Sequence, residues 1–117
     1  MEILPKDKLL NLSGKTAIVT GGSLGIGYGI SYRLAEAGAN VVITSRNLEE
    51  VNKAVEELKQ KGFKTSGVKT DVSIEEEVKN LVAEAIKSFG SVDILVNNAG
   101  VFPFAPLSQL TSELLIK

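Results

Sequence analysis

Short apolar runs alternate with amphipathic stretches along this chain of 117 residues, and this alternation constrains its fold more than any other feature. Runs rich in branched residues begin near Thr16, Asn40, Lys64 and Val92. Between them, apolar residues recur at spacings of three and four, the period of a helix with one apolar face. Strands that alternate with helices are joined by right-handed crossovers and form a parallel sheet. The sequence therefore predicts an α/β fold.

The expected helices also carry end signals. On the first helix, the predicted apolar face consists of Ile26, Ile30, Leu34 and Ala37. Asn47 with Glu50, and Ser73 with Glu76, have the spacing of a capping box, in which side chains bond the free amides of a first turn. Glycines that follow the last apolar position of each helix predict left-handed helix ends at Gly38, Gly62 and Gly90.

The stretch TGGSLGIG, Thr20 to Gly27, directly follows the first apolar run. In an open parallel sheet, the turn after the first strand is a place where ligands bind. Gly21, Gly25 and Gly27 would permit a tight turn and a close approach of the backbone to a pyrophosphate. The following helix would present its free amides to that anion. The alternative is that these glycines serve only the packing of the helix on the strand.

Other phosphate-binding patterns fit less well. SGKT, residues 13–16, resembles the end of a P-loop, but Leu9 stands where that motif needs its first glycine, and the lysine precedes the strand. The GxGxxG fingerprint fails because the spacing here is Gly-x-x-x-Gly-x-Gly. A (β/α)8 barrel shares the alternation of elements, but its phosphate site usually follows late strands.

The end of the second apolar run bears on the choice of nucleotide. Many NAD enzymes carry an acidic residue there that binds the ribose 2′-hydroxyl. Here the run ends in Ser45 and Arg46, so a guanidinium is available to pair with a 2′-phosphate and no carboxylate repels it. We therefore predict a preference for NADP(H), with NAD(H) possible. Arg46 would contact the phosphate and Ser45 would assist. The alternative is a solvated Arg46 beside the helix cap Asn47.

The third and fourth strands end in Asp71-Val72 and in Asn97-Asn98-Ala99-Gly100. Because the carboxyl ends of parallel strands meet at one edge of the sheet, these residues are expected beside the glycine loop. Taken singly, Asp71 and the asparagines are also ordinary turn residues. Special residues at all four strand ends favour a binding site.

These motifs, in this order, resemble those of the short-chain dehydrogenase/reductase family over nearly the whole chain. The resemblance implies a Rossmann-like doubly wound sheet, of which residues 1–117 would supply strands in the order 3-2-1-4 with helices on both faces. It implies hydride transfer between a nicotinamide and a carbonyl or alcohol carbon. The implied cofactor-binding residues are Gly21, Ser23, Leu24, Gly25, Ile26, Gly27, Ser45, Arg46, Asp71, Val72, Asn98, Ala99 and Gly100.

Within that set, the resemblance gives each group a role. The glycine loop would line the pyrophosphate and the approach to the nicotinamide. Asp71 would bond the adenine amino group, with Val72 stacked nearby. Asn98, Ala99 and Gly100 would border the ribose, while Asn97 would tie the central strands together. Leu24 departs from family members that have a basic residue inside the glycine loop, which weakens the NADP pattern.

The family's catalytic Tyr-x-x-x-Lys pair does not occur in this sequence. Its tyrosines are Tyr28 and Tyr32, and the residues four positions later are Tyr32 and Glu36. We therefore assign no catalytic residue and expect a truncated, N-terminal dinucleotide-binding part of a single Rossmann domain, inactive by itself. The fourth strand would be an apolar edge, which predicts marginal stability or association. Alternatives are a non-enzymatic dinucleotide-binding module, one half of a split enzyme, or a fragment without function.

Composition excludes several other classes. The chain has neither histidine nor cysteine, so it lacks the commonest metal ligands, and we predict no metal site. A net charge of −1 argues against binding of nucleic acid, and no apolar run approaches the length of a membrane span. Without a signal peptide we expect a cytoplasmic protein. The resemblance implies a small-molecule carbonyl or alcohol substrate, of unknown identity, and a homo-oligomer at full length.

Overall fold

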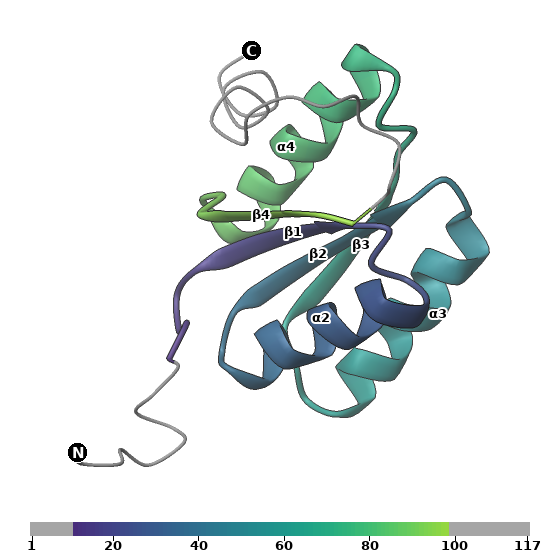
Figure 1. Ribbon diagram of the computed structural model, residues 1–117. Coiled ribbons are helices and arrows are strands. Elements are labelled where there is room, and N and C mark those ends of the chain that lie inside the picture. The colour runs from purple at the N-terminus through teal and green to yellow at the C-terminus, as the bar shows by residue number, and fades with distance from the viewer. Residues whose placement is uncertain (1–10, 99–117) are drawn as a thin grey trace, which may run out of the picture.

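The computed structural model describes residues 11–98, which contain one sheet of four parallel strands in the order β3-β2-β1-β4 (Figure 1). The strands are β1 (Thr16–Thr20), β2 (Asn40–Ser45), β3 (Thr65–Lys69) and β4 (Ile94–Asn97). The helices between them are α2 (Gly25–Glu36), α3 (Leu48–Gln60) and α4 (Glu75–Phe89). The Rossmann-like fold and the strand order 3-2-1-4 predicted from the sequence are confirmed.

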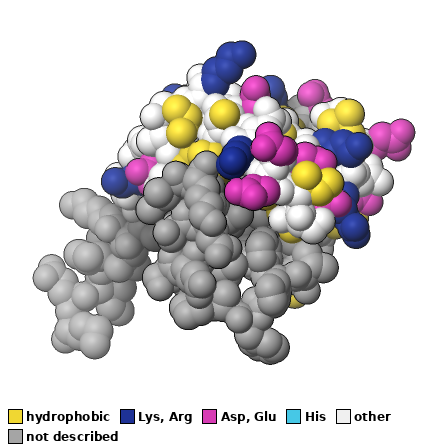
Figure 2. Space-filling view, turned by 90° about the horizontal axis from the view of Figure 1, so that it is seen from above, with side chains coloured by type: hydrophobic (Ala, Val, Ile, Leu, Met, Phe, Trp, Pro, Cys, Tyr) yellow, Lys and Arg dark blue, Asp and Glu magenta, His cyan; other side chains and the backbone are white. Residues whose placement is uncertain are grey.

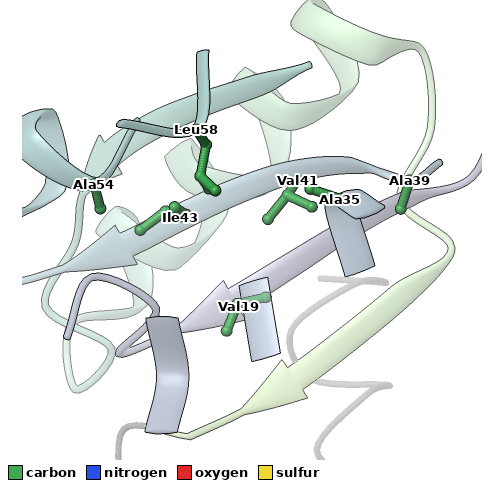
Figure 3. Packing of buried hydrophobic residues seen from close by; sticks show 7 residues of the cluster. All are labelled: Val19, Ala35, Ala39, Val41, Ile43, Ala54 and Leu58. Carbon is green, nitrogen blue, oxygen red and sulfur yellow. The ribbon is translucent and has the colours of Figure 1, made fainter. Parts of the chain in front are cut away.

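Helices cover both faces of the sheet, as expected. α2 and α3 lie on one face and α4 lies on the other (Figure 1). The larger core cluster fills the α2/α3 side, where three residues of the central strands, Val19, Val41 and Ile43, meet Leu58 and two alanines of the helices and one alanine just before β2 (Figure 3). Ile18 and Val42 point to the opposite side and pack with Leu81 of α4. The continuous apolar runs of β1 and β2 are thus explained by burial on both faces.

The predicted apolar face of α2 is correct in part: Ile30 and Leu34 are half-buried and pack against the core cluster, but the fully buried row lies one residue further along the helix. The buried row consists of Gly27, Ser31 and Ala35, whereas Ile26 is 79% exposed. Small side chains occupy the row because the start of α2 lies very close to the sheet. A Cβ on Gly22, for example, would lie 2.8 Å from the Ser31 hydroxyl and 2.9 Å from the Val19 carbonyl oxygen. Pattern analysis that counts large apolar residues misses a face built this way.

The predictions for helix ends were confirmed at four of five places. Glycines with φ between 87° and 102° follow all three helices, at Gly38, Gly62 and Gly90. The Asn47 side chain accepts a hydrogen bond from the Glu50 amide at 3.1 Å and caps α3. The Ser73 cap is wrong. Ile74 is the N-cap residue of α4, and its apolar side chain provides no hydrogen bond. The Ser73 hydroxyl donates to Asp71 instead.

β4 is the outermost strand of the described sheet, and all four of its residues are half-buried. Leu95 packs on the α4 side and Val96 on the α2/α3 side, so both faces of the strand have apolar contacts. Self-association through this strand stays a prediction. Across residues 11–98, none of the helices has the length and apolar character required to cross a bilayer.

Candidate functional site

The carboxyl ends of the four strands meet at one edge of the sheet, where the glycine loop joins β1 to α2. Thr20 is in register with Thr44 on one side and with Asn97 on the other. The amides of Gly21 and Gly22 both donate to the Thr44 carbonyl oxygen, at 2.8 and 3.3 Å. The loop is therefore fastened to the end of β2 by its backbone. Gly21 and Gly25 have backbone φ angles of 64° and 56°, in a region that residues other than glycine rarely adopt.

Gly27 allows the closest approach in the loop. A Cβ at this position would overlap the carbonyl oxygen of Gly21 and would lie 2.6 Å from the side-chain nitrogen of Asn98. The Asn98 side chain donates to the same Gly21 carbonyl at 3.3 Å. Gly27 therefore serves close packing, which was the alternative interpretation of this glycine. The lack of a side chain here lets Asn98, at the end of β4, lie against the loop.

Asn97 and Asn98 join β4 to β1 through one buried hydroxyl. The amide of Asn98 donates to Thr20 Oγ1 at 2.9 Å, and the Thr20 hydroxyl lies 3.3 Å from both the Asn97 side-chain oxygen and the Val96 carbonyl oxygen. This contact agrees with the structural role expected for Asn97. Asn98, which was expected beside a ribose, holds the glycine loop in place through its side-chain hydrogen bond to the Gly21 carbonyl oxygen.

The N-terminus of α2 differs from those of α3 and α4. Its N-cap residue, Leu24, makes no side-chain cap, and its first turn has no acidic residue. α3 is capped by Asn47 and has two glutamates in its first turn, and α4 has three. Acidic side chains and caps normally balance the free amides and the positive end of the helix dipole. Among the described helices, only α2 leaves this requirement to a ligand or solvent.

A groove of about 220 Å³ lies between the ends of β2 and β3. Its wall residues are Gly21, Thr44, Ser45, Arg46, Thr70, Asp71, Val72 and Ser73. Five of them were predicted as site residues. Thr44, Thr70 and Ser73 were missed, because threonine and serine at strand ends are too common to stand out in a sequence.

Two hydroxyls in this groove are unusual. Thr44 and Thr70 are 0% and 1% exposed, and their Oγ1 atoms have no hydrogen-bond partner among the described residues. A buried hydroxyl without a partner costs about 1–3 kcal/mol. Both residues line the groove, but neither hydroxyl oxygen is accessible at its surface.

Asp71 is held in its ionised form beside the groove. One carboxylate oxygen accepts hydrogen bonds from the Ser73 hydroxyl at 2.6 Å and from the Ser73 amide at 2.9 Å. These bonds, with a smaller contribution from the positive charge of Arg46, lower the pKa of Asp71 below its ordinary value. The other carboxylate oxygen is left for a donor such as an exocyclic amine.

Ser45 and Arg46 lie at the rim of the groove. The Ser45 hydroxyl accepts from the Asn47 amide at 3.1 Å and lies 3.2 Å from its carbonyl oxygen, which fixes the turn into α3. Arg46 is exposed, and within residues 11–98 its guanidinium has no ion pair at 4.0 Å or less. It is therefore available to an anion from solution.

The remaining predicted residues are not brought into the groove. Ser23 is buried in the glycine loop, while Leu24 and Ile26 are 59% and 79% exposed beside the start of α2. Ala99 and Gly100 lie outside the described residues. Within residues 11–98, no three carboxylates gather closely enough to hold a metal ion. On the face drawn in Figure 2, acidic and basic side chains are interspersed over the described surface.

The chain is similar to known proteins both in sequence and in structure. Residues 15–117 match the family model described as short chain dehydrogenase. A tropinone reductase-like protein of Erythroxylum coca is 46% identical over 100 residues, which are 86% of this chain and 39% of the relative. The chain thus spans about two fifths of the length of the curated relatives it matches.

Solved structures agree with the sequence match. A hydroxysteroid dehydrogenase from Escherichia coli superposes with a TM-score of 0.78 at 41% identity, covering 95% of this chain and 47% of that one. An L-sorbose reductase from Gluconobacter frateurii, solved with NADPH and L-sorbose, gives a TM-score of 0.74 at 36% identity, covering 92% and 44%.

Proposed function

The chain belongs to the short-chain dehydrogenase/reductase family, and from this premise we propose that it is the NADP(H)-binding part of an oxidoreductase. When bound, the nicotinamide would exchange a hydride with a carbonyl or alcohol carbon of a small substrate. Residues 1–117 would form the N-terminal part of one Rossmann domain, which acts as a homo-oligomer at full length.

The observation that carries the proposal is the unbalanced N-terminus of α2. Its first turn has neither a cap nor an acidic residue, and the three glycines of the loop, Gly21, Gly25 and Gly27, add no side chains of their own to its approach. Free amides and the positive helix end favour an anion at this place. We assign it to the pyrophosphate, with Ser23, Leu24 and Ile26 of the loop toward the nicotinamide.

The groove between β2 and β3 would hold the adenosine. Asp71, ionised and with one oxygen free of Ser73, would accept from the adenine amino group, and Val72 would lie against the ring. Thr44 and Thr70 would line the wall of the groove beside it. Asn98, Ala99 and Gly100 would border the ribose next to the nicotinamide.

The preference for NADP(H) over NAD(H) rests on the rim of the groove. Arg46 and Ser45 stand where an acidic residue would repel a 2′-phosphate, and the guanidinium is exposed. The similar L-sorbose reductase was solved with NADPH. We propose that Arg46 pairs with the 2′-phosphate and that Ser45 positions the turn beneath it.

Catalysis needs more than this chain contains. A tyrosine followed four residues later by a lysine is absent from its sequence, so no side chain of that kind is present to move the proton of the reaction. We propose that the 117-residue chain binds cofactor without turning over substrate. A non-enzymatic dinucleotide-binding module, or one half of a split enzyme, is the alternative that this absence favours.

Fluorescence titration of the chain with NADPH and with NADH tests the proposal. We expect NADPH to bind at least tenfold more tightly. Arg46→Gln should weaken NADPH binding by about 10–100-fold, the value of a charge-assisted hydrogen bond, and leave NADH binding unchanged. Arg33→Gln is the control, because Arg33 is an exposed residue of α2 that pairs with Glu36. Equal affinities for the two nucleotides, or no binding of either, would overturn the proposal.

A further inference from the structure

Lys69, the last residue of β3, lies beside Arg46 and was not singled out by any motif. Together with Asn47, Leu48 and Glu49, these two cations line an open hollow on the outer side of Arg46. Arg46 also lines the proposed adenosine groove, so this residue borders both hollows. A ligand group that leaves the groove across Arg46 would enter the hollow that Lys69 borders.

Strand register puts the Lys69 side chain on the face of the sheet that α3 covers, the same face as Ser45. Lys69 is the parallel partner of Ser45, the residue that precedes Arg46, and neighbouring strands are about 4.8 Å apart. Residues two apart in a strand share a face. A Cβ on Gly67 would meet Val51 and Val55 of α3, so Lys69 also belongs to the α3 face. Ser45 shares that face, because Ile43 is in the core cluster beneath α3.

The charge of a 2′-phosphate requires more than one cation. A phosphate monoester carries a charge of about −1.5 to −2 at neutral pH. The glycine loop offers none, because Thr20 to Gly27 contains no lysine or arginine. Within residues 11–98, Lys69 has no ion pair at 4.0 Å or less and is exposed, so its ammonium group is available to a ligand.

We propose that Lys69 is the second cation for the 2′-phosphate of NADP(H) and a specificity-determining residue of the site. The inference rests on the proposed function and adds to it a residue from a different strand. It explains how a member of this family without a basic glycine loop selects the phosphorylated nucleotide. Glu49, the one acidic residue lining the hollow, would oppose this binding.

Titration of the full chain with NADPH, NADH and 2′,5′-ADP tests the assignment. We expect Lys69→Gln to weaken NADPH and 2′,5′-ADP by about tenfold, the lower end for a charge-assisted contact, with no change for NADH. Lys64→Gln is the matched control, because Lys64 lies just before the opposite end of β3. Glu49→Gln should tighten NADPH severalfold.

The outcomes separate this inference from the proposed function. If Arg46→Gln weakens NADPH selectively while Lys69→Gln changes it less than twofold, Lys69 has no role and the proposed function stands. Equal weakening of NADPH and NADH by Lys69→Gln would indicate a structural effect and would also overturn the inference. If the unsubstituted chain binds neither NADPH nor 2′,5′-ADP, the proposed function and the inference both fail.

Discussion

Thr20 and Thr44 are register partners on adjacent strands, yet only one of their hydroxyls is used. The Thr20 hydroxyl accepts from the Asn98 amide and joins β1 to β4. The Thr44 hydroxyl is fully buried and has no partner among the described residues. The link to β4 therefore accounts for the first hydroxyl, whereas no contact of the described chain accounts for the second, although Thr44 lines the groove.

Valine substitutions should separate the two threonines. Thr20→Val removes the acceptor of the half-buried Asn98 amide and should lower the free energy of unfolding by about 1–3 kcal/mol. Thr44→Val removes an unpaired hydroxyl at equal volume and should leave the free energy of unfolding unchanged or raise it by up to about 1 kcal/mol. Urea unfolding followed by circular dichroism measures both.

NADPH titration of the Thr44→Val protein completes this test. If the hydroxyl serves the nucleotide, the variant should bind NADPH more weakly although it is no less stable. A Thr44→Val protein that is clearly less stable than the unsubstituted chain would show that this hydroxyl already has a partner in the free protein.

The fold was predictable from the sequence because its signals are local and repeated. Branched apolar runs, three helix-ending glycines and one asparagine cap each act within a few residues, and the strand order follows from the family motifs at the strand ends. The buried row of α2 was not predictable, since Gly27 and Ser31 carry no hydrophobic signal. Their burial depends on how closely the helix lies to the sheet, which only the assembled structure reveals.

The candidate site divides in the same way. Gly21, Arg46 and Asp71 were predicted because they follow successive strands and together match the motifs of one family. Lys69, at the end of β3, and Thr70, directly after it, are residue types that are common at the ends of strands. Their significance comes from strand register and burial, so the sequence gives no signal for them.

Gly27 and Gly29 form a matched pair within α2. Alanine at position 27 would place its Cβ against the backbone of Gly21, which cannot move without breaking the loop. We expect Gly27→Ala to lower the free energy of unfolding by about 1–3 kcal/mol or more. Gly29 has open space around its Cβ position, so Gly29→Ala should raise it by about 0.5–1 kcal/mol. Thermal unfolding of both variants gives the comparison, and equal effects would contradict the close approach at Gly27.

Asp93 gives the fold a dependence on acid pH. Its carboxylate accepts from the Thr16 amide at 2.9 Å and from the Ser91 hydroxyl at 2.9 Å, and these bonds lower its pKa below the ordinary value of 3.8. The folded state therefore holds the ionised form more strongly than the unfolded state does. Its stabilising effect is present above pH 4 and is lost as the pH falls through the folded-state pKa.

Asp93→Asn isolates this effect, because asparagine keeps an oxygen that can accept from Thr16. We expect the variant to have a lower free energy of unfolding at pH 7, with a difference that shrinks as the pH is lowered below 4. Urea unfolding at pH 7, 5 and 3 measures the difference directly. A difference that stays constant over this range would assign the loss to packing and not to the charge.

Tyr28 should show the opposite dependence, at alkaline pH. Burial, and next a hydrogen bond with the Glu57 side chain, raise its pKa above the ordinary value of 10.0. The neutral phenol is favoured in the folded state, so its stabilising effect is present below pH 10 and is lost as the pH rises through the folded-state pKa. The chain has two tyrosines and no tryptophan, so ultraviolet absorbance reports the ionisation of Tyr28 and Tyr32 together, without interference from tryptophan. We expect Glu57→Gln to lower the pKa of Tyr28, while the control Glu56→Gln, which removes the charge of a residue that accepts from Gln60, leaves it unchanged. Identical titration curves for the unsubstituted chain and Glu57→Gln would show that Glu57 has no influence on the phenol.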